Sequence, residues 1–191
     1  MASTAGKERM MDGIAEEAVE ILLAREKIEA RVRELGVEIA RDYRGRTPHL
    51  VGVLKGAWVF MADLIRQFDF DVTVDFLGIT SYGAGVHSSG EVKITKDLDV
   101  SIEGRDVLIV EDILDTGRTF KFLQDMLSVH KPRSLRLVTL LDKASRRVVD
   151  VHADYVGFEI PDVFVVGYGL DFNQRYRQLP DLRVLRSQPS V

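Results

Sequence analysis

One segment constrains the fold of this chain more than any other: the run VLIVEDILDTGRT at positions 107–119. An uninterrupted apolar run is typical of a strand that is buried on both faces, as the strands of parallel sheets are. The run ends in two adjacent acids, Glu111 and Asp112, and a polar turn then leads into a helical pattern that extends to about residue 130. A strand, a turn and a helix in this order predict a βαβ unit, and hence a parallel sheet.

The same alternation of strands and helices runs through the rest of the chain. We expect helical segments at 14–46, 57–68 and 118–130, and strands at 49–54, 70–76, 92–98, 106–110, 135–141, 155–158 and 163–166. Gly36 interrupts the first helical run, where a glycine costs about 1 kcal/mol relative to alanine. No internal repeat or linker divides the chain. These patterns predict a single α/β domain over residues 1–191, with residues 1–13 as a loose tail.

Composition excludes several classes of protein. The length of 191 residues, with 46% hydrophobic and 29% charged residues, is typical of one ordinary globular domain. The net charge of −4 gives no basic surplus to attract a nucleic acid, and the lack of cysteine excludes disulfides, zinc–thiolate sites and thiol nucleophiles. No apolar run approaches the ~20 residues of a membrane span, and the polar N-terminal segment has no signal core. We therefore expect a cytoplasmic protein without a membrane partner.

The polar turn after the central strand allows two interpretations. Ligands of open parallel sheets bind beyond the carboxyl ends of the strands, and Asp115, Thr116 and Gly117 offer backbone N–H groups and hydroxyls beside a helix N-terminus. These are the components of a phosphate site, but Asp and Thr before a helix are also common helix caps. The turn lacks both the P-loop pattern and the dinucleotide-binding glycine pattern. Taken alone, the turn leaves the two interpretations open.

Taken whole, VLIVEDILDTGRT resembles the phosphoribosyl-pyrophosphate signature of the type I phosphoribosyltransferases. Further segments, in collinear order over roughly residues 14–185, are similar to the 6-oxopurine branch, the hypoxanthine/guanine phosphoribosyltransferases. They are Val53-Leu54-Lys55-Gly56, Ser81-Tyr82, Leu141-Asp142-Lys143 and PDVFVVGYGLDFNQRYR at 161–177. The resemblance implies an open, mainly parallel sheet flanked by helices, with a flexible lid loop and a small hood built from terminal segments. It also implies a homo-oligomer, either a dimer or a tetramer.

The resemblance implies a purine salvage reaction. The phosphoribosyl group would pass from phosphoribosyl pyrophosphate to N9 of hypoxanthine, and of guanine, giving IMP or GMP and pyrophosphate with Mg²⁺ as cofactor. Positive charge builds on the ribose and negative charge on the leaving group. The reaction therefore needs a phosphate anchor, a metal ion, a cover against water and a group that handles the purine proton.

The resemblance assigns the phosphoribosyl pyrophosphate site residue by residue. The 5′-phosphate would lie against Asp115, Thr116, Gly117, Arg118 and Thr119. Glu111 and Asp112 would accept hydrogen bonds from the ribose hydroxyls, and together with Asp171 they are the candidate magnesium ligands. Asp115 would also face purine N7 as the general acid/base. Pyrophosphate would contact Lys55, Gly56 and Arg177, with a non-proline cis peptide expected at Lys55-Gly56.

The resemblance also assigns the purine site and the lid. Lys143 would donate to the exocyclic O6, Phe164 would stack on the base, and the backbone of Val165 would read its edge beside Asp171. Residues 80–96, with Ser81 and Tyr82 at the near end, would form the lid. Without the resemblance, Lys143 and Arg177 would be interpreted as solvated side chains, Phe164 as core and the loop as a plain connection.

Two other interpretations share the first motif. A regulatory protein with the phosphoribosyltransferase fold that binds a nucleotide and RNA would carry the acidic pair and the phosphate loop, but should also have a basic face, whereas this chain is net acidic. An orotate or adenine phosphoribosyltransferase fits the C-terminal segment poorly.

Overall fold

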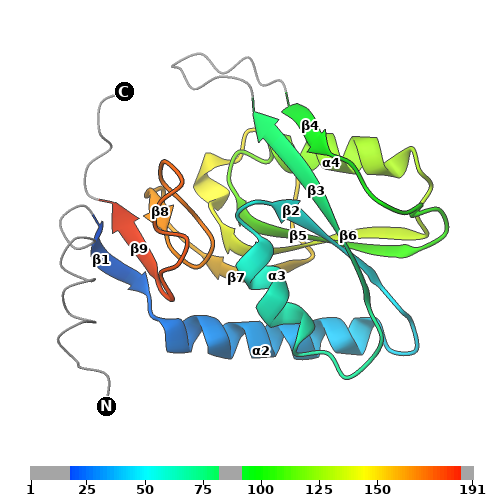
Figure 1. Ribbon diagram of the computed structural model, residues 1–191, viewed down its shortest axis with the longest axis horizontal. Coiled ribbons are helices and arrows are strands. Elements are labelled where there is room, and N and C mark those ends of the chain that lie inside the picture. Colours follow the sequence, from blue (N-terminus) through cyan, green and yellow to red (C-terminus); the bar gives the residue numbers. More distant parts are fainter. Residues whose placement is uncertain (1–17, 82–91, 186–191) are drawn as a thin grey trace.

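The computed structural model describes residues 18–81 and 92–185. Figure 1 shows a large sheet with its helices and a small sheet at one end of the molecule. The expected tail at 1–13 and most of the expected lid, Tyr82 included, lie outside the described residues; Ser81 is the last residue of a strand of the large sheet. None of the helices in the described ranges is long and apolar enough to cross a membrane.

The large sheet has six strands in the order β4-β3-β2-β5-β6-β7. Strand β4 is antiparallel to its neighbour at one edge, and all the other neighbouring pairs are parallel. The strands are β2 (His49–Leu54), β3 (Thr73–Ser81), β4 (Val92–Lys96), β5 (Asp106–Leu114), β6 (Ser134–Asp142) and β7 (Tyr155–Glu159). The expected mainly parallel sheet is therefore confirmed.

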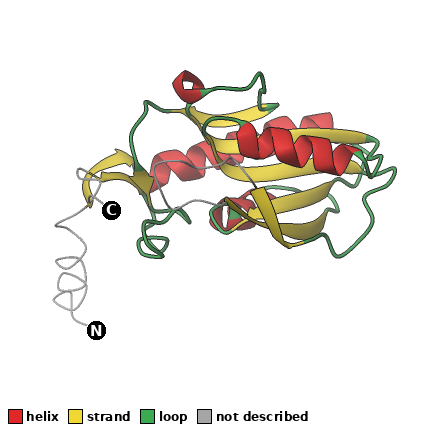
Figure 2. Ribbon diagram, turned by 90° about the horizontal axis from the view of Figure 1, so that it is seen from above, coloured by secondary structure: helices red, strands yellow, loops and turns green. Residues whose placement is uncertain are grey.

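Helices cover both faces of this sheet (Figure 2). One face packs against α2 (Arg25–Asp42) and α3 (Trp58–Ile65), and the other against α4 (Arg118–Ser128). Alternate residues of each central strand belong to different clusters: Leu50 of β2 packs with the α2 and α3 side, whereas Val51 packs with the α4 side. Both sets of side chains are buried, which is why these strands read as continuous apolar runs.

The small sheet forms the hood that the sequence analysis expected. Strands β1 (Ala18–Leu23), β9 (Leu182–Leu185) and β8 (Val165–Val166) pair antiparallel in that order. The first and the last described segments of the chain thus lie side by side, and β1 leads almost directly into α2 (Figure 1).

Several predicted boundaries were wrong. Residues 18–23 form a strand, not the start of a helix, because they pair with β9, about 160 residues further along the chain, and no local pattern can show that partner. Gly36 does not interrupt α2: a β-carbon there would overlap the side chain of Gln67, so the glycine allows close packing. Strand β5 continues beyond residue 110 as far as Leu114 and includes both acids. Strand β3 begins at residue 73 instead of 70, and β8 has only two residues.

Candidate active site

The candidate site lies at the carboxyl ends of β2, β5 and β6. These strands are parallel neighbours, so their ends meet at one edge of the sheet. The segments that follow them carry the predicted residues: 55–56 after β2, 115–119 after β5, and Lys143 after β6. The backbone N–H of Lys143 donates to the carbonyl of Leu114 at 3.0 Å, which fixes the last two segments against each other.

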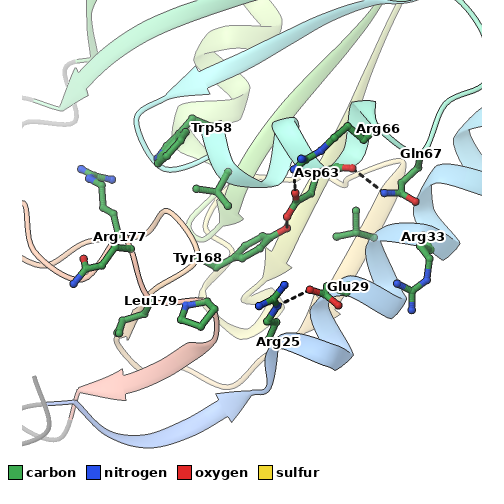
Figure 3. A pocket seen from close by; sticks show the side chains of 14 residues that line it. Arg25, Glu29, Arg33, Trp58, Asp63, Arg66, Gln67, Tyr168, Arg177 and Leu179 are labelled. Atoms are coloured by element: carbon green, nitrogen blue, oxygen red, sulfur yellow. Dashed lines mark hydrogen bonds and ion pairs between the residues drawn. The ribbon is translucent and has the colours of Figure 1, made fainter. Parts of the chain in front are cut away.

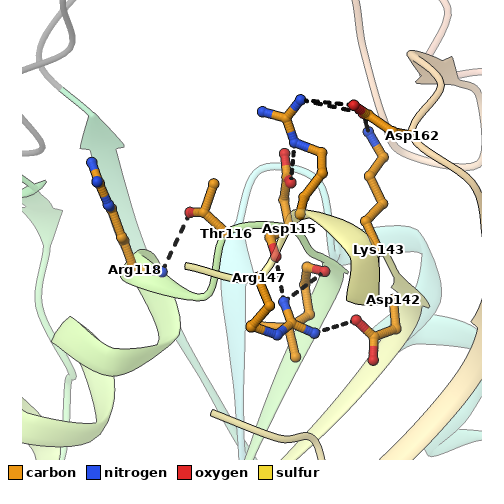
Figure 4. A network of polar contacts seen from close by, with 9 residues as sticks. Asp115, Thr116, Arg118, Asp142, Lys143, Arg147 and Asp162 are labelled. Carbon is orange, nitrogen blue, oxygen red and sulfur yellow. Dashed lines mark hydrogen bonds and ion pairs between the residues drawn. The ribbon is translucent and has the colours of Figure 1, made fainter. Parts of the chain in front are cut away.

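The turn at 115–119 has the geometry of an anion site. Gly117 has a φ of +84° and stands at the N-cap of α4, whose first turn contains no acidic residue. The Thr116 hydroxyl accepts a hydrogen bond from the N–H of Arg118 at 3.4 Å (Figure 4). The Asp115 carboxylate does not cap the helix, because it accepts from Arg146 at 2.7 Å. The positive end of the α4 dipole is therefore not neutralised by a carboxylate of the turn.

The segment after β6 supports this turn from outside. Arg147 donates to the carbonyl oxygens of Leu114, at 3.1 Å, and of Asp115, and it also binds the carboxylate of Asp142. The N–H of Val148 donates to the Thr116 carbonyl at 3.0 Å. Because the backbone of the turn is held by these contacts, its N–H groups are pre-oriented before any ligand arrives.

The two adjacent acids line a cavity of about 230 Å³. Glu111 is 9% exposed, and its Oε2 atom has no hydrogen-bond partner. Burial, together with the charge of Asp112, raises the pKa of Glu111 well above its ordinary value. Burial also raises the pKa of Asp112, to about 6, although backbone N–H groups and the charge of Arg177 act in the opposite direction. Thr119 lies in the same cavity, so the acids and the end of the phosphate turn face one space.

Gly56 is the point where the end of β2 approaches the acids. A β-carbon on Gly56 would overlap the carboxylate of Asp112, so this close approach requires glycine. The expected non-proline cis peptide is present one bond earlier than predicted, between Leu54 and Lys55. The Lys55 side chain is exposed, with its ammonium 3.4 Å from the side-chain oxygen of Gln174.

A second cavity, of about 310 Å³, adjoins the first and shares three of its residues. The shared residues are Lys55, Gly56 and Asp112. The second cavity is also lined by all four predicted purine-site residues and by two further predicted residues, namely Lys143, Phe164, Val165, Asp171, Asp115 and Arg177. The geometry thus brings the predicted phosphoribosyl and purine residues around two neighbouring cavities.

Three side chains of the second cavity are neither freely solvated nor part of the hydrophobic core. Lys143 is 7% exposed, with its ammonium 3.8 Å from Asp162. Phe164 is 37% exposed and meets Phe172 edge to face, with ring centroids 5.7 Å apart, so it is not a core residue. Arg177 is not a solvated side chain either: it pairs with Asp171 at 2.6 Å and donates to the Gly169 carbonyl at 2.7 Å.

The carboxylates suit a magnesium ion that is shared with a substrate. Within residues 18–81 and 92–185, no three His, Asp or Glu side chains form a metal cage. Glu111 and Asp112 line the first cavity, and Asp112 and Asp171 line the second. Magnesium is commonly held by one or two carboxylates together with substrate phosphates, and the unpartnered Glu111 oxygen is an available acceptor at this place.

A larger cavity, about 800 Å³, lies between α2, α3 and the segment 168–180 and shares only Arg177 with the second site cavity (Figure 3). Its arginines are largely paired within the protein: Arg25 with Glu29 at 2.6 Å, and Arg66 with Asp63. The Tyr168 hydroxyl donates to the same Asp63 at 2.6 Å. Size alone therefore does not identify the site, since this cavity holds none of the acids or turn residues described above.

Comparisons with known proteins agree with this geometry. A family model for the phosphoribosyl transferase domain matches residues 18–173. The hypoxanthine-guanine phosphoribosyltransferase of Bacillus subtilis strain 168 is 52% identical over 166 residues, which cover 87% of this chain and 92% of that protein. This chain belongs to the phosphoribosyltransferase family, in its hypoxanthine-guanine branch.

A solved structure of a hypoxanthine-guanine phosphoribosyltransferase from Bacillus anthracis, with a HEPES molecule in its active site, is 47% identical to this phosphoribosyltransferase chain. The TM-score is 0.85, and the match covers 88% of this chain and 99% of that one. The bifunctional TilS/HprT protein of Listeria monocytogenes serotype 4b is 51% identical over 168 residues, or 88% of this chain, and the match spans only 26% of that longer protein.

Three charged residues beside the site were missed by the sequence analysis: Arg146, Arg147 and Asp162. Arg146 lies at the end of the short 3₁₀ helix Ala144–Arg146, between Asp115 and Asp162. These two partners of Arg146 are 31 and 16 residues away from it in the sequence. No regular spacing marks such contacts, and the only available signal was the pair of arginines shortly after Lys143.

Proposed function

We propose that this phosphoribosyltransferase transfers the 5-phosphoribosyl group of phosphoribosyl pyrophosphate to N9 of hypoxanthine or guanine. One observation carries the proposal: the cavity of the acidic pair and the cavity of Lys143 and Phe164 are neighbours that share Lys55, Gly56 and Asp112 in their linings. A ribose in the first space would present its anomeric carbon to a base in the second. Holding the two reactants in this way supplies much of the rate enhancement of a two-substrate transfer.

The residues of the first cavity bind and orient the phosphoribosyl group. The backbone N–H groups of the turn at 115–119, with the hydroxyls of Thr116 and Thr119, hold the 5′-phosphate. Glu111 and Asp112 accept hydrogen bonds from the ribose hydroxyls when they are ionised. Magnesium, when bound at Glu111, Asp112 or Asp171, supplies positive charge beside the pyrophosphate.

The pyrophosphate end is bound by Lys55 and Gly56, which line both cavities, and by Arg177 of the second cavity. Gly56 leaves room for a phosphate next to its backbone, and Lys55 and Arg177 bring positive charge to that place. Arg177 is held by Asp171 and by the Gly169 carbonyl, so its guanidinium has a fixed direction before pyrophosphate forms.

The residues of the second cavity select a 6-oxopurine. An ammonium has donors only, so Lys143 favours the 6-oxo group over the 6-amino group of adenine. Phe164 is partly exposed and lines the cavity, where it would stack on the base, and the backbone of Val165 would read the edge of the base. Asp115 takes the proton that the base loses as N9 attacks. Because the phosphorylated cosubstrate does not cross membranes, we place the reaction in the cytoplasm, and we expect a homo-oligomer that needs no nucleic acid.

A steady-state assay of the purified chain tests this proposal. Phosphoribosyl pyrophosphate and Mg²⁺ are supplied with hypoxanthine, guanine, xanthine, adenine or uracil in parallel, and pyrophosphate release is measured. We expect turnover with hypoxanthine or guanine and little with adenine or uracil. A folded chain that binds the cosubstrate but turns over no base would contradict the proposal and favour a regulatory nucleotide-binding protein.

A further inference from the structure

Four charged side chains of alternating sign, Lys143, Asp162, Arg146 and Asp115, are linked by ion pairs beside the purine cavity, and the first and last of them line it. Figure 4 labels Lys143, Asp162 and Asp115 of this series. The Lys143 ammonium lies 3.8 Å from Asp162. Asp162 is bound by Nη1 of Arg146 at 3.1 Å, and Nε of the same arginine donates to Oδ1 of Asp115 at 2.7 Å. The series therefore begins at one candidate base-reading residue and ends at the other.

Lys143 and Asp115, at the two ends of this series of ion pairs, would face neighbouring atoms of the base. In a 6-oxopurine, O6 and N7 lie side by side on one edge, and both are acceptors when N7 is unprotonated. In the proposed function, on which this inference rests, Lys143 donates to O6 and Asp115 handles a proton at N7. Their ammonium and carboxylate must then be held at a fixed separation, and only Arg146 and Asp162 connect them among the described residues.

We propose that Arg146 is a positioning residue for purine recognition and proton transfer. Its guanidinium binds Oδ1 of Asp115 and leaves Oδ2 for the base. Through Asp162, it also holds the Lys143 ammonium toward the cavity. A guanidinium suits this role because its planar fork donates to two carboxylates in different directions, which a lysine ammonium does less well.

The solvent exposure of these ion-paired side chains distinguishes a positioning role of Arg146 from a role in the stability of the fold. The side chain of Arg146 is 44% exposed, and those of Asp115 and Asp162 are 38% and 53% exposed. Ion pairs at such exposure contribute little to folding. Removing Arg146 should therefore change catalysis much more than it changes the melting temperature.

The substitution Arg146→Gln tests the inference, with Arg25→Gln as matched control. Arg25 forms an exposed ion pair with Glu29 at 2.6 Å and lines neither site cavity. For Arg146→Gln we expect kcat/KM for hypoxanthine to fall about tenfold, a part of the 100-fold or more that a general acid/base group supplies. The KM for phosphoribosyl pyrophosphate and the melting temperature should match those of Arg25→Gln, and Arg146→Lys should show an intermediate loss.

A second variant, at Asp162, tests the same series of ion pairs without relying on Arg146→Gln alone. Asp162→Asn breaks the same series at its next link, so the double variant with Arg146→Gln should lose no more than the more damaging single substitution. Additive losses, or an Arg146→Gln enzyme with unchanged kcat/KM for hypoxanthine, would overturn the inference while wild-type turnover upholds the proposed function. A wild-type chain without turnover would overturn both.

Discussion

At the scale of single residues, the most unusual groups are the two acids at the end of β5. Neither Glu111 nor Asp112 forms an ion pair with a basic side chain in the described part of the chain, and burial raises the pKa of both. An ionised carboxylate in this place lowers the stability of the fold. Groups of this kind are typical of functional sites, where a ligand supplies the missing partners.

The substitution Glu111→Gln should therefore stabilise the chain at neutral pH. The folded protein raises the pKa of Glu111, so it binds more protons than the unfolded chain as pH rises above the ordinary glutamate range, and wild-type stability falls over that window. At pH 7.5 we expect a gain on the order of 1 kcal/mol, which is about 2–4 °C in Tm for a chain of this size. The gain should shrink at pH 5. Thermal melts at both pH values measure it, and a lower Tm for the variant at pH 7.5 would refute the prediction.

A single substitution at Asp115 tests its proposed role as general acid/base. Asp115→Asn keeps the turn and its backbone N–H groups but removes the proposed acceptor of the purine proton. We expect kcat to fall about 100-fold, with the KM for phosphoribosyl pyrophosphate changed by less than about threefold. Asp125→Asn, on the exposed side of α4, is the matched control. Steady-state kinetics measure both variants, and equal kcat values would show that Asp115 takes no part in proton transfer.

At the scale of elements, the site depends on how the turn between β5 and α4 is built. Gly117 combines a left-handed backbone with close packing, since a β-carbon would overlap the side chains of Val151 and Val149. A side chain at this position would therefore have to displace the turn, and with it the N–H groups that precede α4.

Comparing Gly117→Ala with Gly104→Ala separates the cost of the left-handed backbone from the cost of close packing. Gly104 has a φ of +68°, but no atom lies within 4 Å of the place that a β-carbon would take, so alanine there meets only the backbone cost, about 1 kcal/mol. We expect Gly117→Ala to cost about 2 kcal/mol more and to raise the KM for phosphoribosyl pyrophosphate. Denaturant unfolding measures both variants. Equal losses of unfolding free energy would show that packing against Val151 contributes nothing.

Elements that are buried on both faces could be predicted from the sequence, and elements defined by distant partners could not. Strands β2 and β6 lie within a residue of their predicted bounds, because their apolar runs report burial directly. Strand β1 is held by β9, from the far end of the chain, and its local pattern suited a helix. The charged chain through Arg146 has the same character, since each link joins residues from different loops.

At the scale of the whole molecule, the proposed reaction depends on a parallel sheet that ends in two neighbouring cavities with shared lining residues. The fold and the family were predicted from motifs in collinear order, and the roles of the individual residues came from the resemblance. The structure adds the reason why those residues lie close together: three neighbouring strands end at one edge, and Asp112 lines both cavities. The cavity of about 800 Å³ beside Trp58 contains none of the acids or turn residues of this arrangement and shares only Arg177 with it.

The most direct test of the two-cavity site is a crystal structure of the chain with IMP, Mg²⁺ and pyrophosphate. We predict that the base lies against Phe164 with O6 at the Lys143 ammonium, and that the ribose hydroxyls meet Glu111 and Asp112. A nucleotide bound in the cavity of about 800 Å³ beside Trp58, or a base that turns O6 away from Lys143, would contradict this arrangement.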